Sequence, residues 1–267
     1  MKHYILFTVD YLETEKYFMK FDKKLYSLLS KTQEYFYKKH SLLHHVDHLE
    51  GPNIWVLSPH PDDDVIGCGG TIIKHIAMGH KVNIIYLCSG DKGIKDKNPV
   101  EVTIIRKSEA LNAALVLGLS ESNLHFLNFE DEKLLQNIDH AALEIKKLFN
   151  DVPPDLIYLP SFLDKHNDHF ATNQIFKKLN INNTVIVAYE VWTPLIPNRI
   201  VDISAVISQK EKAIQAHVSQ IKALQYDQAI IGLNRYRAKM YTKKSFEYAE
   251  AFLVINSQDY NSLIPEF

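Results

Sequence analysis

Hydrophobic residues follow two alternating patterns along the chain. Short apolar runs rich in β-branched residues predict buried strands at about 53–59, 81–88, 123–128, 155–160 and 184–190. Between these runs, apolar positions recur at helical spacing and predict helices at about 67–79, 101–117, 136–150 and 169–180. A strand–helix–strand rhythm joins parallel strands by right-handed crossovers. The pattern therefore predicts an α/β fold with a mostly parallel sheet and helices on both faces.

Both ends of the chain add to this Rossmann-like core. The pattern predicts one long helix at 204–225 and a final strand near 246–255. Residues 1–50 mix aromatic and charged side chains at helical spacing, which predicts an N-terminal helical extension before a main domain at 51–267. Four histidines lie in that extension, namely His40, His44, His45 and His48. We favour weak adventitious metal binding for them over a second metal site, because exposed helical histidines four residues apart usually do no more.

Composition limits the class of protein. The chain has 267 residues, 46% of them hydrophobic, and a formal net charge of -2, which offers no basic surface for nucleic acid. Its two cysteines, Cys68 and Cys88, predict no disulfide framework and are unfavoured as metal ligands, so a cytoplasmic location is expected. The apolar start is interrupted by Asp10 and Glu13, and no apolar run reaches about 18 residues, so neither signal peptide nor membrane span is expected.

The first cluster of residues that could form a functional site is His60-Pro61-Asp62-Asp63-Asp64, directly after a predicted strand. Zinc binds imidazole nitrogen and carboxylate oxygen, and a catalytic site supplies three protein ligands and leaves a position for water. His60 and Asp63 could converge on one ion across a tight turn, which would leave Asp62 beside the water. The alternative is a helix N-terminus, with Asp64 capping a helix that begins near Gly67.

The second cluster, His166-Asn167-Asp168-His169, follows another predicted strand about a hundred residues later. Two histidines three residues apart can present one nitrogen to a metal and another to a substrate, with Asp168 orienting an imidazole. Each histidine alone would more simply be a solvated loop residue. Two complementary clusters at strand exits favour a site, because open α/β sheets bind ligands at the carboxyl ends of their strands.

Together these motifs resemble the PIG-L/LmbE-like family of zinc-dependent N-deacetylases, whose pattern is His-Pro-Asp-Asp-Glu, then glycines, then His-x-Asp-His. Further stretches that fit are Ser89-Gly90-Asp91, Arg106 with Glu109, Tyr189 to Pro194, and Lys212 to Gln220. The resemblance covers about residues 52–256. Asp64 stands where the family usually has Glu.

The resemblance implies hydrolysis of an acetamide with Zn2+ as cofactor. The implied ligands are His60, Asp63 and His169. Zinc would activate a water and polarise the amide carbonyl, while Asp62 takes the proton of the water and later gives it to the leaving amine. His166, kept protonated or well oriented by Asp168, would stabilise the oxyanion.

The implied substrate is an N-acetylated amino sugar of the GlcNAc type. By resemblance, Arg106 and Asp91 would face sugar hydroxyls or a phosphate, although Arg106 could instead form a surface ion pair with Glu109 or Glu101. Three further family positions have no fixed role, namely Glu190, Trp192 and His217. The family also suggests a homo-oligomer, and a glycolipid substrate would have to be met at the membrane surface.

Three alternatives stay open at this stage. The glycines from Gly67 to Gly70 invite a dinucleotide-binding turn, but Ile72 stands where the third glycine of that motif is needed. A zinc-stabilised sugar-binding module without turnover would not need Asp62 or His166, whose presence favours catalysis. An amidase acting on a thiol–sugar conjugate would use the same residues.

Overall fold

The computed structural model describes residues 44–46, 48–242 and 245–266. The residues from Leu43 onward form one compact unit. The helices predicted for residues 1–43 lie outside the described residues, and the boundary at residue 50 stays a prediction. The helical extension predicted at 1–50 needs one correction, because His44–Val46 form a strand, β1, and not part of a helix.

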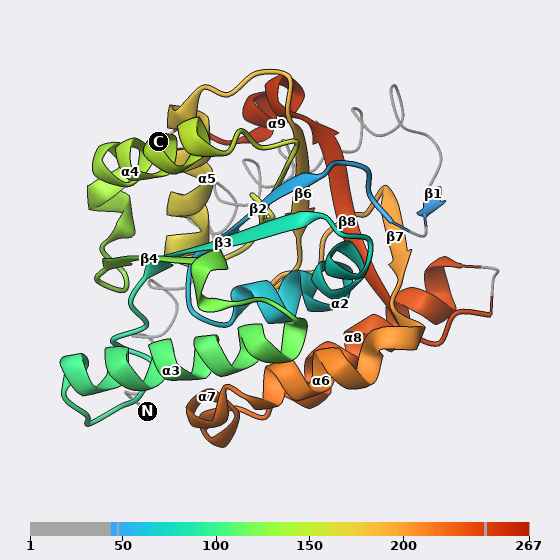
Figure 1. Cartoon of the computed structure of the whole chain (residues 1–267), viewed down its shortest axis with the longest axis horizontal. Coiled ribbons are helices and arrows are strands. Elements are labelled where there is room, and N and C mark those ends of the chain that lie inside the picture. Colours follow the sequence, from blue (N-terminus) through green and yellow to red (C-terminus); the bar gives the residue numbers. More distant parts are fainter. Residues whose placement is uncertain (1–43, 47, 243–244, 267) are drawn as a thin grey trace, which may run out of the picture. The chain divides into compact units, whose positions relative to one another are not determined.

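The described residues form an eight-stranded sheet in the order β1-β7-β8-β6-β5-β2-β3-β4 (Figure 1). Its further strands are β2 (Asn53–Ser58), β3 (Lys81–Cys88), β4 (Leu124–Phe129), β5 (Leu156–Pro160), β6 (Val185–Tyr189), β7 (Arg199–Asp202) and β8 (Ala249–Asn256). Every pairing is parallel except those of β8 with β6 and β7. The mostly parallel sheet expected from the hydrophobic pattern is confirmed.

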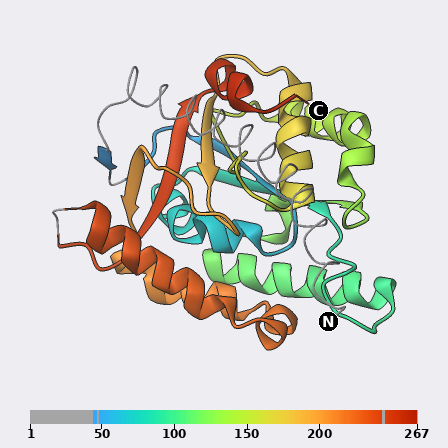
Figure 2. The same cartoon turned by 180° about the vertical axis from the view of Figure 1, so that it is seen from behind.

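Helices cover both faces of this sheet, as Figures 1 and 2 show from opposite sides. One face carries α2 (Asp63–Ala77), α3 (Pro99–Leu117), α6 (Ile207–Gln215), α7 (Val218–Ala223) and α8 (Tyr226–Tyr241). The other carries α4 (Ile138–Asp151), α5 (Asn167–Leu179) and α9 (Ser257–Leu263). The prediction of a single helix at 204–225 is wrong. A 3-10 turn at Ser204–Val206 precedes α6, and a break at His217 separates α6 from α7.

Helix α2 begins at Asp63, before the glycines that were expected to start it. A Cβ atom on Gly67 would lie 2.2 Å from the Tyr189 ring, and one on Gly70 would lie 2.7 Å from Ile203. These glycines therefore let α2 approach the sheet closely. Because they lie inside the helix, they do not form the strand-to-helix turn that a dinucleotide-binding motif requires.

A buried ion pair lies beside the kink that α2 makes at Cys68. Lys210 Nζ lies 2.7 Å from Glu250 Oε1 and donates to the carbonyl of Ile66 at 3.0 Å. Glu250 in turn accepts the backbone N–H groups of Gly70 and Thr71, each at 2.8 Å. The pair thus satisfies backbone groups at the kink just behind the site.

We expect Lys210→Met to lower the free energy of unfolding by about 3–5 kcal/mol, because it leaves the Glu250 charge buried without its cation. The matched control is Lys178→Met, which breaks an exposed pair with Asp139 at 2.8 Å. That change should cost about 1 kcal/mol or less. Urea unfolding measures both, and equal losses in the two variants would contradict the proposed role of the buried pair.

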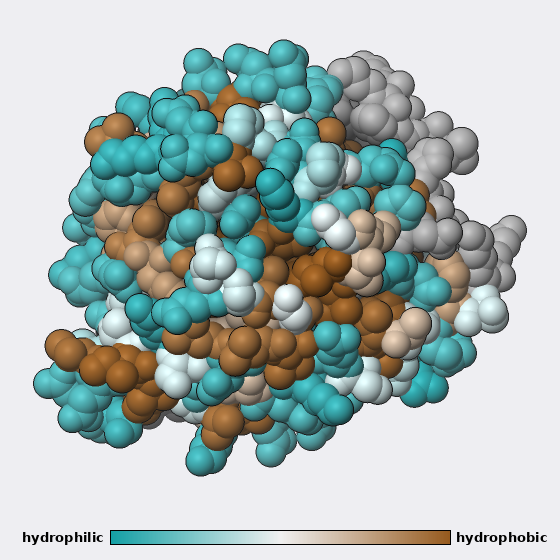
Figure 3. All heavy atoms as spheres, viewed as in Figure 1, coloured by the Kyte–Doolittle hydropathy of each residue, from teal (hydrophilic) through white to brown (hydrophobic). Residues whose placement is uncertain are grey.

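The surface carries hydrophobic side chains among polar ones (Figure 3). Large exposed hydrophobic residues on α3 are Val100, Ile104 and Leu115. Scattered exposure of this kind does not identify a partner, so the homo-oligomer stays a prediction. In the described part of the chain, no helix is both long and apolar enough to span a bilayer.

Candidate active site

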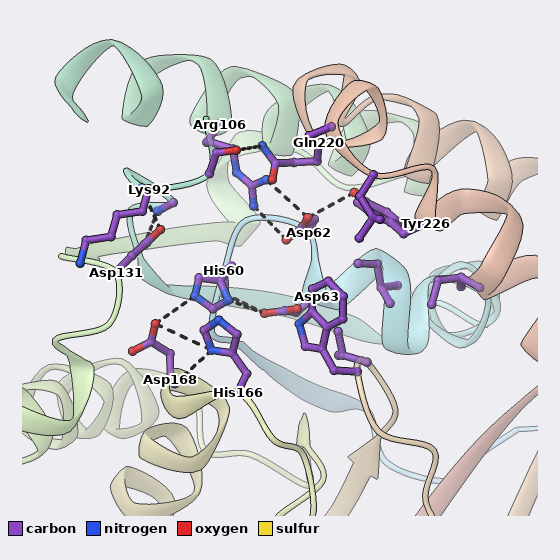
Figure 4. A pocket seen from close by; sticks show the side chains of 18 of the residues that line it. His60, Asp62, Asp63, Lys92, Arg106, Asp131, His166, Asp168, Gln220 and Tyr226 are labelled. Carbon is purple, nitrogen blue, oxygen red and sulfur yellow. Dashed lines mark hydrogen bonds and ion pairs between the residues drawn. The ribbon is translucent and has the colours of Figure 1, made fainter. Parts of the chain in front are cut away.

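The two predicted clusters meet at the carboxyl ends of β2 and β5, which are neighbours in the sheet. They line a cavity of about 500 Å³ (Figure 4). Six of the predicted site residues line it, namely His60, Asp62, Asp63, Arg106, His166 and Asp168. Its volume falls within the range of small-molecule sites, roughly 300–1,000 Å³.

Two of the three expected metal ligands, His60 and His169, lie close to a carboxylate oxygen of the third, Asp63. Asp63 Oδ2 lies 3.2 Å from His60 Nδ1 and also 3.2 Å from His169 Nε2. Ligand atoms about 2.1 Å from a tetrahedral zinc lie about 3.4 Å apart, and both of these separations are close to that value. Among the described residues, the triads whose donor atoms all lie within 4.8 Å of one another are His60 with His166 and His169, and His60 with Cys88 and Asp131, so Asp63 with both imidazoles is not one of them. His169 is fully buried and neither of its ring nitrogens makes a well-aligned hydrogen bond. The donor set therefore fits a zinc site.

Each imidazole has a second carboxylate on its other nitrogen. Asp168 Oδ2 lies 3.1 Å from His60 Nε2, and Asp164 Oδ1 lies 3.3 Å from His169 Nδ1. Burial alone would lower both pKa values, but these carboxylates and Asp63 raise the pKa of His60 to about 10 and that of His169 to about 9. The surroundings thus favour positive charge at this point, as a cation site requires. Carboxylates in this position orient metal-binding histidines.

The role expected of Asp168 needs correction. Its carboxylate serves His60 and lies 4.0 Å from His166 Nδ1, whereas its backbone N–H donates to that nitrogen at 3.2 Å. Because Nδ1 is an acceptor, the proton of a neutral His166 is on Nε2. Burial and the charges of His60 and His169 lower the pKa of His166, so it is a neutral hydrogen-bond donor and is not held protonated.

Asp62 points away from Asp63, as expected for adjacent residues where a strand turns into a helix (Figure 4). Its Oδ1 accepts from Arg106 Nη2 at 2.9 Å, and its Oδ2 accepts from the Tyr226 hydroxyl at 3.2 Å. Arg106 is therefore not in the surface ion pair considered for it. Glu109 instead accepts from the backbone and side chain of Ser219.

Asp91 does not line the cavity. It accepts from the Ser89 hydroxyl at 3.1 Å and from the backbone N–H of Asp131 at 2.9 Å. Asp131 lines the cavity at this side, so Asp91 supports the wall that Asp131 forms. Five polar lining residues were missed by the sequence analysis, namely Lys92, Asp131, Glu132, Gln225 and Tyr226, and Gln220 had been noted only as the end of a stretch that fits the family.

Among the three family positions without a fixed role, Trp192 alone lines the cavity. Glu190 forms a buried ion pair with Arg237. His217 is fully buried without a hydrogen-bond partner for either nitrogen, and burial lowers its pKa to about 4. Asp164 was also missed, although its position two residues before His166 is a signal that could have found it.

Asp64 and Cys88 lie near the first motif, and their surroundings favour structural roles over metal binding. Asp64 lies in the first turn of α2, with its carboxylate near Ser58 and Tyr86, so it is not the cap considered for it, and Asp62 holds the N-cap position. Cys88 is buried, yet its sulfur lies within 4.8 Å of donor atoms of His60 and Asp131. Burial raises the pKa of the Cys88 thiol, which disfavours the thiolate that binds metals.

Comparison with known proteins supports the resemblance seen in the motifs. Residues 55–180 match the PIG-L family, described as GlcNAc-PI de-N-acetylase. The chain is 28% identical over 187 residues to diacetylchitobiose deacetylase of Thermococcus kodakarensis, covering 61% of this chain and 68% of the relative. It is 27% identical over 197 residues to a probable N-acetyl-alpha-D-glucosaminyl L-malate deacetylase 2 of Bacillus cereus, covering 66% of this chain and 86% of that one.

A solved structure agrees in fold. The N,N'-diacetylchitobiose deacetylase from Pyrococcus horikoshii superimposes with a TM-score of 0.67 at 24% identity, over 78% of this chain and 85% of that chain. The resemblance to the PIG-L/LmbE-like family expected from the motifs is therefore confirmed, as is the expected class of enzyme, an N-deacetylase.

Proposed function

We propose that this protein is a zinc-dependent hydrolase that removes the N-acetyl group from an N-acetylated amino sugar of the GlcNAc type. The observation that carries the proposal is that Asp63 Oδ2 contacts the imidazoles of both His60 and His169, beside a cavity that His60, Asp62 and Asp63 line. When bound there, zinc would polarise the amide carbonyl and lower the pKa of a water.

The remaining chemistry falls to side chains of the cavity. Asp62 would accept a proton from the attacking water and return it to the leaving amine. Arg106 and Tyr226 fix the direction of the Asp62 carboxylate by donating to both of its oxygens. His166 would donate from Nε2 to the oxygen that gains negative charge as the carbonyl carbon becomes tetrahedral. Because His166 is neutral, it donates without having to hold an extra proton.

The substrate class rests on the family and on the polar cavity wall. The relatives described above are named for N-acetylated sugar substrates, and Asp131, Lys92 and Gln220 supply groups that can bind hydroxyls. The described cysteines are free and buried, which fits the proposed cytoplasmic location. Contact with a glycolipid at a membrane surface stays a prediction, and a thiol–sugar conjugate remains an alternative substrate.

An amine-release screen tests the proposal directly. The zinc-loaded protein is incubated with N-acetylglucosamine, N,N'-diacetylchitobiose and N-acetylated amino acids, and free amine is measured. Release from sugars and not from amino acids supports the proposal. Release from amino acids alone, or from no acetamide, would contradict it.

We expect His166→Ala to lower kcat about a hundredfold while the metal content stays unchanged, because a donor to the developing oxyanion is lost. His140→Ala is the control, since His140 lies on the exposed surface of α4. Metal analysis accompanies the kinetics. If His166→Ala loses its metal, His166 is a ligand and the donor role assigned to it is wrong.

A further inference from the structure

The cavity has an exposed tryptophan at its edge. The Trp192 side chain is 55% exposed, whereas Trp55, the only other tryptophan of the chain, is 2% exposed and packs in the core. Leu224, also on the cavity wall, is 52% exposed. Large apolar groups left open to water beside a cavity are typical of a binding surface.

Trp192 lies on a loop whose backbone is held from two sides. Asp164 Oδ2 accepts the backbone N–H of Trp192 at 2.9 Å and that of Thr193 at 3.3 Å. Glu190 accepts the N–H of Leu195 at 2.8 Å, and the buried Arg237 of α8 binds both Glu190 and the Leu195 carbonyl. The indole is thus exposed on a fixed backbone. A ligand that covers it therefore binds with little entropy cost from ordering the loop.

The same contacts join the Trp192 loop to the helical wall of the cavity. Arg237 belongs to α8, and the cavity residues Leu224 and Ile230 lie before and within that helix. Val191 packs against the core cluster that contains Ile230. We call Val191, Trp192, Leu224 and Ile230 the apolar wall.

A polar wall stands elsewhere around the same cavity. It contains Asp131 together with Lys92 and Glu132, which form an exposed ion pair at 2.9 Å. In Figure 4, Lys92 and Tyr226, the residue that begins α8, lie on opposite sides of the cavity. An occupant in contact with both walls needs an apolar face and polar edges. A pyranose ring has this character, with C–H groups on its faces and hydroxyls around its rim, whereas an alkyl chain has no groups for the polar wall.

We propose that Trp192 is the platform of a second sugar subsite, so that the preferred substrate is an N-acetylated disaccharide or longer oligosaccharide. The ring next to the reacting sugar would stack on the indole and direct its hydroxyls toward Lys92 and Glu132. This inference rests on the proposed function, since the first subsite is the deacetylation site. It makes Trp192 a residue that determines specificity, with no part in the chemical step.

Kinetics on three substrates separate the outcomes. Trp192→Ala should lower kcat/KM for N,N'-diacetylchitobiose about tenfold to a hundredfold, the value of burying one large apolar side chain. The same variant should lower kcat/KM for N-acetylglucosamine much less than for the disaccharide, and Trp192→Phe should give an intermediate loss for the disaccharide. Tyr236→Ala is the control, because Tyr236 is an exposed aromatic residue of α8 outside the cavity lining. Equal losses for both sugars, or none, would overturn the proposal, as would a loss confined to octyl N-acetylglucosaminide.

Fluorescence gives a readout that does not depend on turnover. Because Trp55 is buried, emission from exposed indole reports on Trp192, and it should shift to shorter wavelength when the deacetylated disaccharide chitobiose is added. Trp192→Phe should abolish the shift. Absence of a shift in the wild type would overturn the second subsite. If the wild type releases no amine from any sugar yet shows this shift, the proposed function has failed and the sugar-binding surface stands.

Discussion

Asp62→Asn is expected to lower kcat by about a hundredfold to ten thousandfold, the range of general acid–base catalysis. An amide cannot accept the proton of the attacking water, whereas its shape still allows the contacts with Arg106 and Tyr226. Metal content should be unchanged, because Asp62 points away from the gathered ligand atoms. Released amine is measured directly, so that a slow reaction is not mistaken for none.

The control for this change is Asp64→Asn in the same motif. Burial raises the pKa of Asp64 to about 7, so about half of the Asp64 carboxyl groups are protonated near neutrality, and an amide has nearly the same shape. Asp64 lies outside the cavity lining, and its substitution should leave kcat unchanged. Thermal unfolding is followed in both variants, since Asp62→Asn also removes the charge that Arg106 faces. Normal turnover by folded Asp62→Asn would mean that the base lies elsewhere, even with the metal site intact.

The hydrophobic pattern predicted the central part of the fold because both periodicities are strong there. Strands β2, β3 and β5 are almost continuously buried, and such runs stand out from amphipathic helices. The pattern failed where elements are short or locally broken. Strand β7 has four residues and takes its place by pairing with β8 and β1, which are distant in sequence. The break at His217 leaves no signal in apolar spacing.

The site was predictable to the extent that its residues are close in sequence. His60 and Asp63 contact each other within one turn, so their spacing carries the geometry. The partner of Asp168 could not be predicted in the same way, because its contact with His60 spans 108 residues and depends on β2 and β5 being neighbours. The contact of Tyr226 with Asp62 spans 164 residues and depends on how α8 packs.

Removing any one of the three proposed ligands is expected to abolish tight metal binding and, with it, activity. We predict one zinc per chain in the wild type and none retained by His60→Ala, Asp63→Ala or His169→Ala after dialysis against a chelator, because two remaining donors do not hold the ion. Full occupancy in all three variants would contradict the site. A variant with glutamine at the four histidines of residues 40–48 controls for metal bound there.

The carboxylates behind the imidazoles should have a graded effect. Asp168→Asn and Asp164→Asn are expected to keep the metal with an affinity about ten- to a hundredfold lower, since each carboxylate orients one ligating histidine. Competition with a chromophoric chelator measures that affinity. Complete loss of the metal in Asp168→Asn would make Asp168 a ligand.

Two further variants decide between the proposed ligand set and its neighbours in the cavity. A ring nitrogen of His166 lies within 4.8 Å of those of His60 and His169, and Cys88 and Asp131 form a similar group with His60. The backbone N–H of Asp168 already occupies His166 Nδ1, and the thiol of Cys88 is protonated, so His166→Ala and Cys88→Ser should both keep full metal occupancy. Loss of metal from His166→Ala with retention in Asp63→Ala would replace the carboxylate by a third histidine. Asp63 would then hold the two imidazoles in place without touching the ion, and the proposed site would have to be redrawn around three nitrogens.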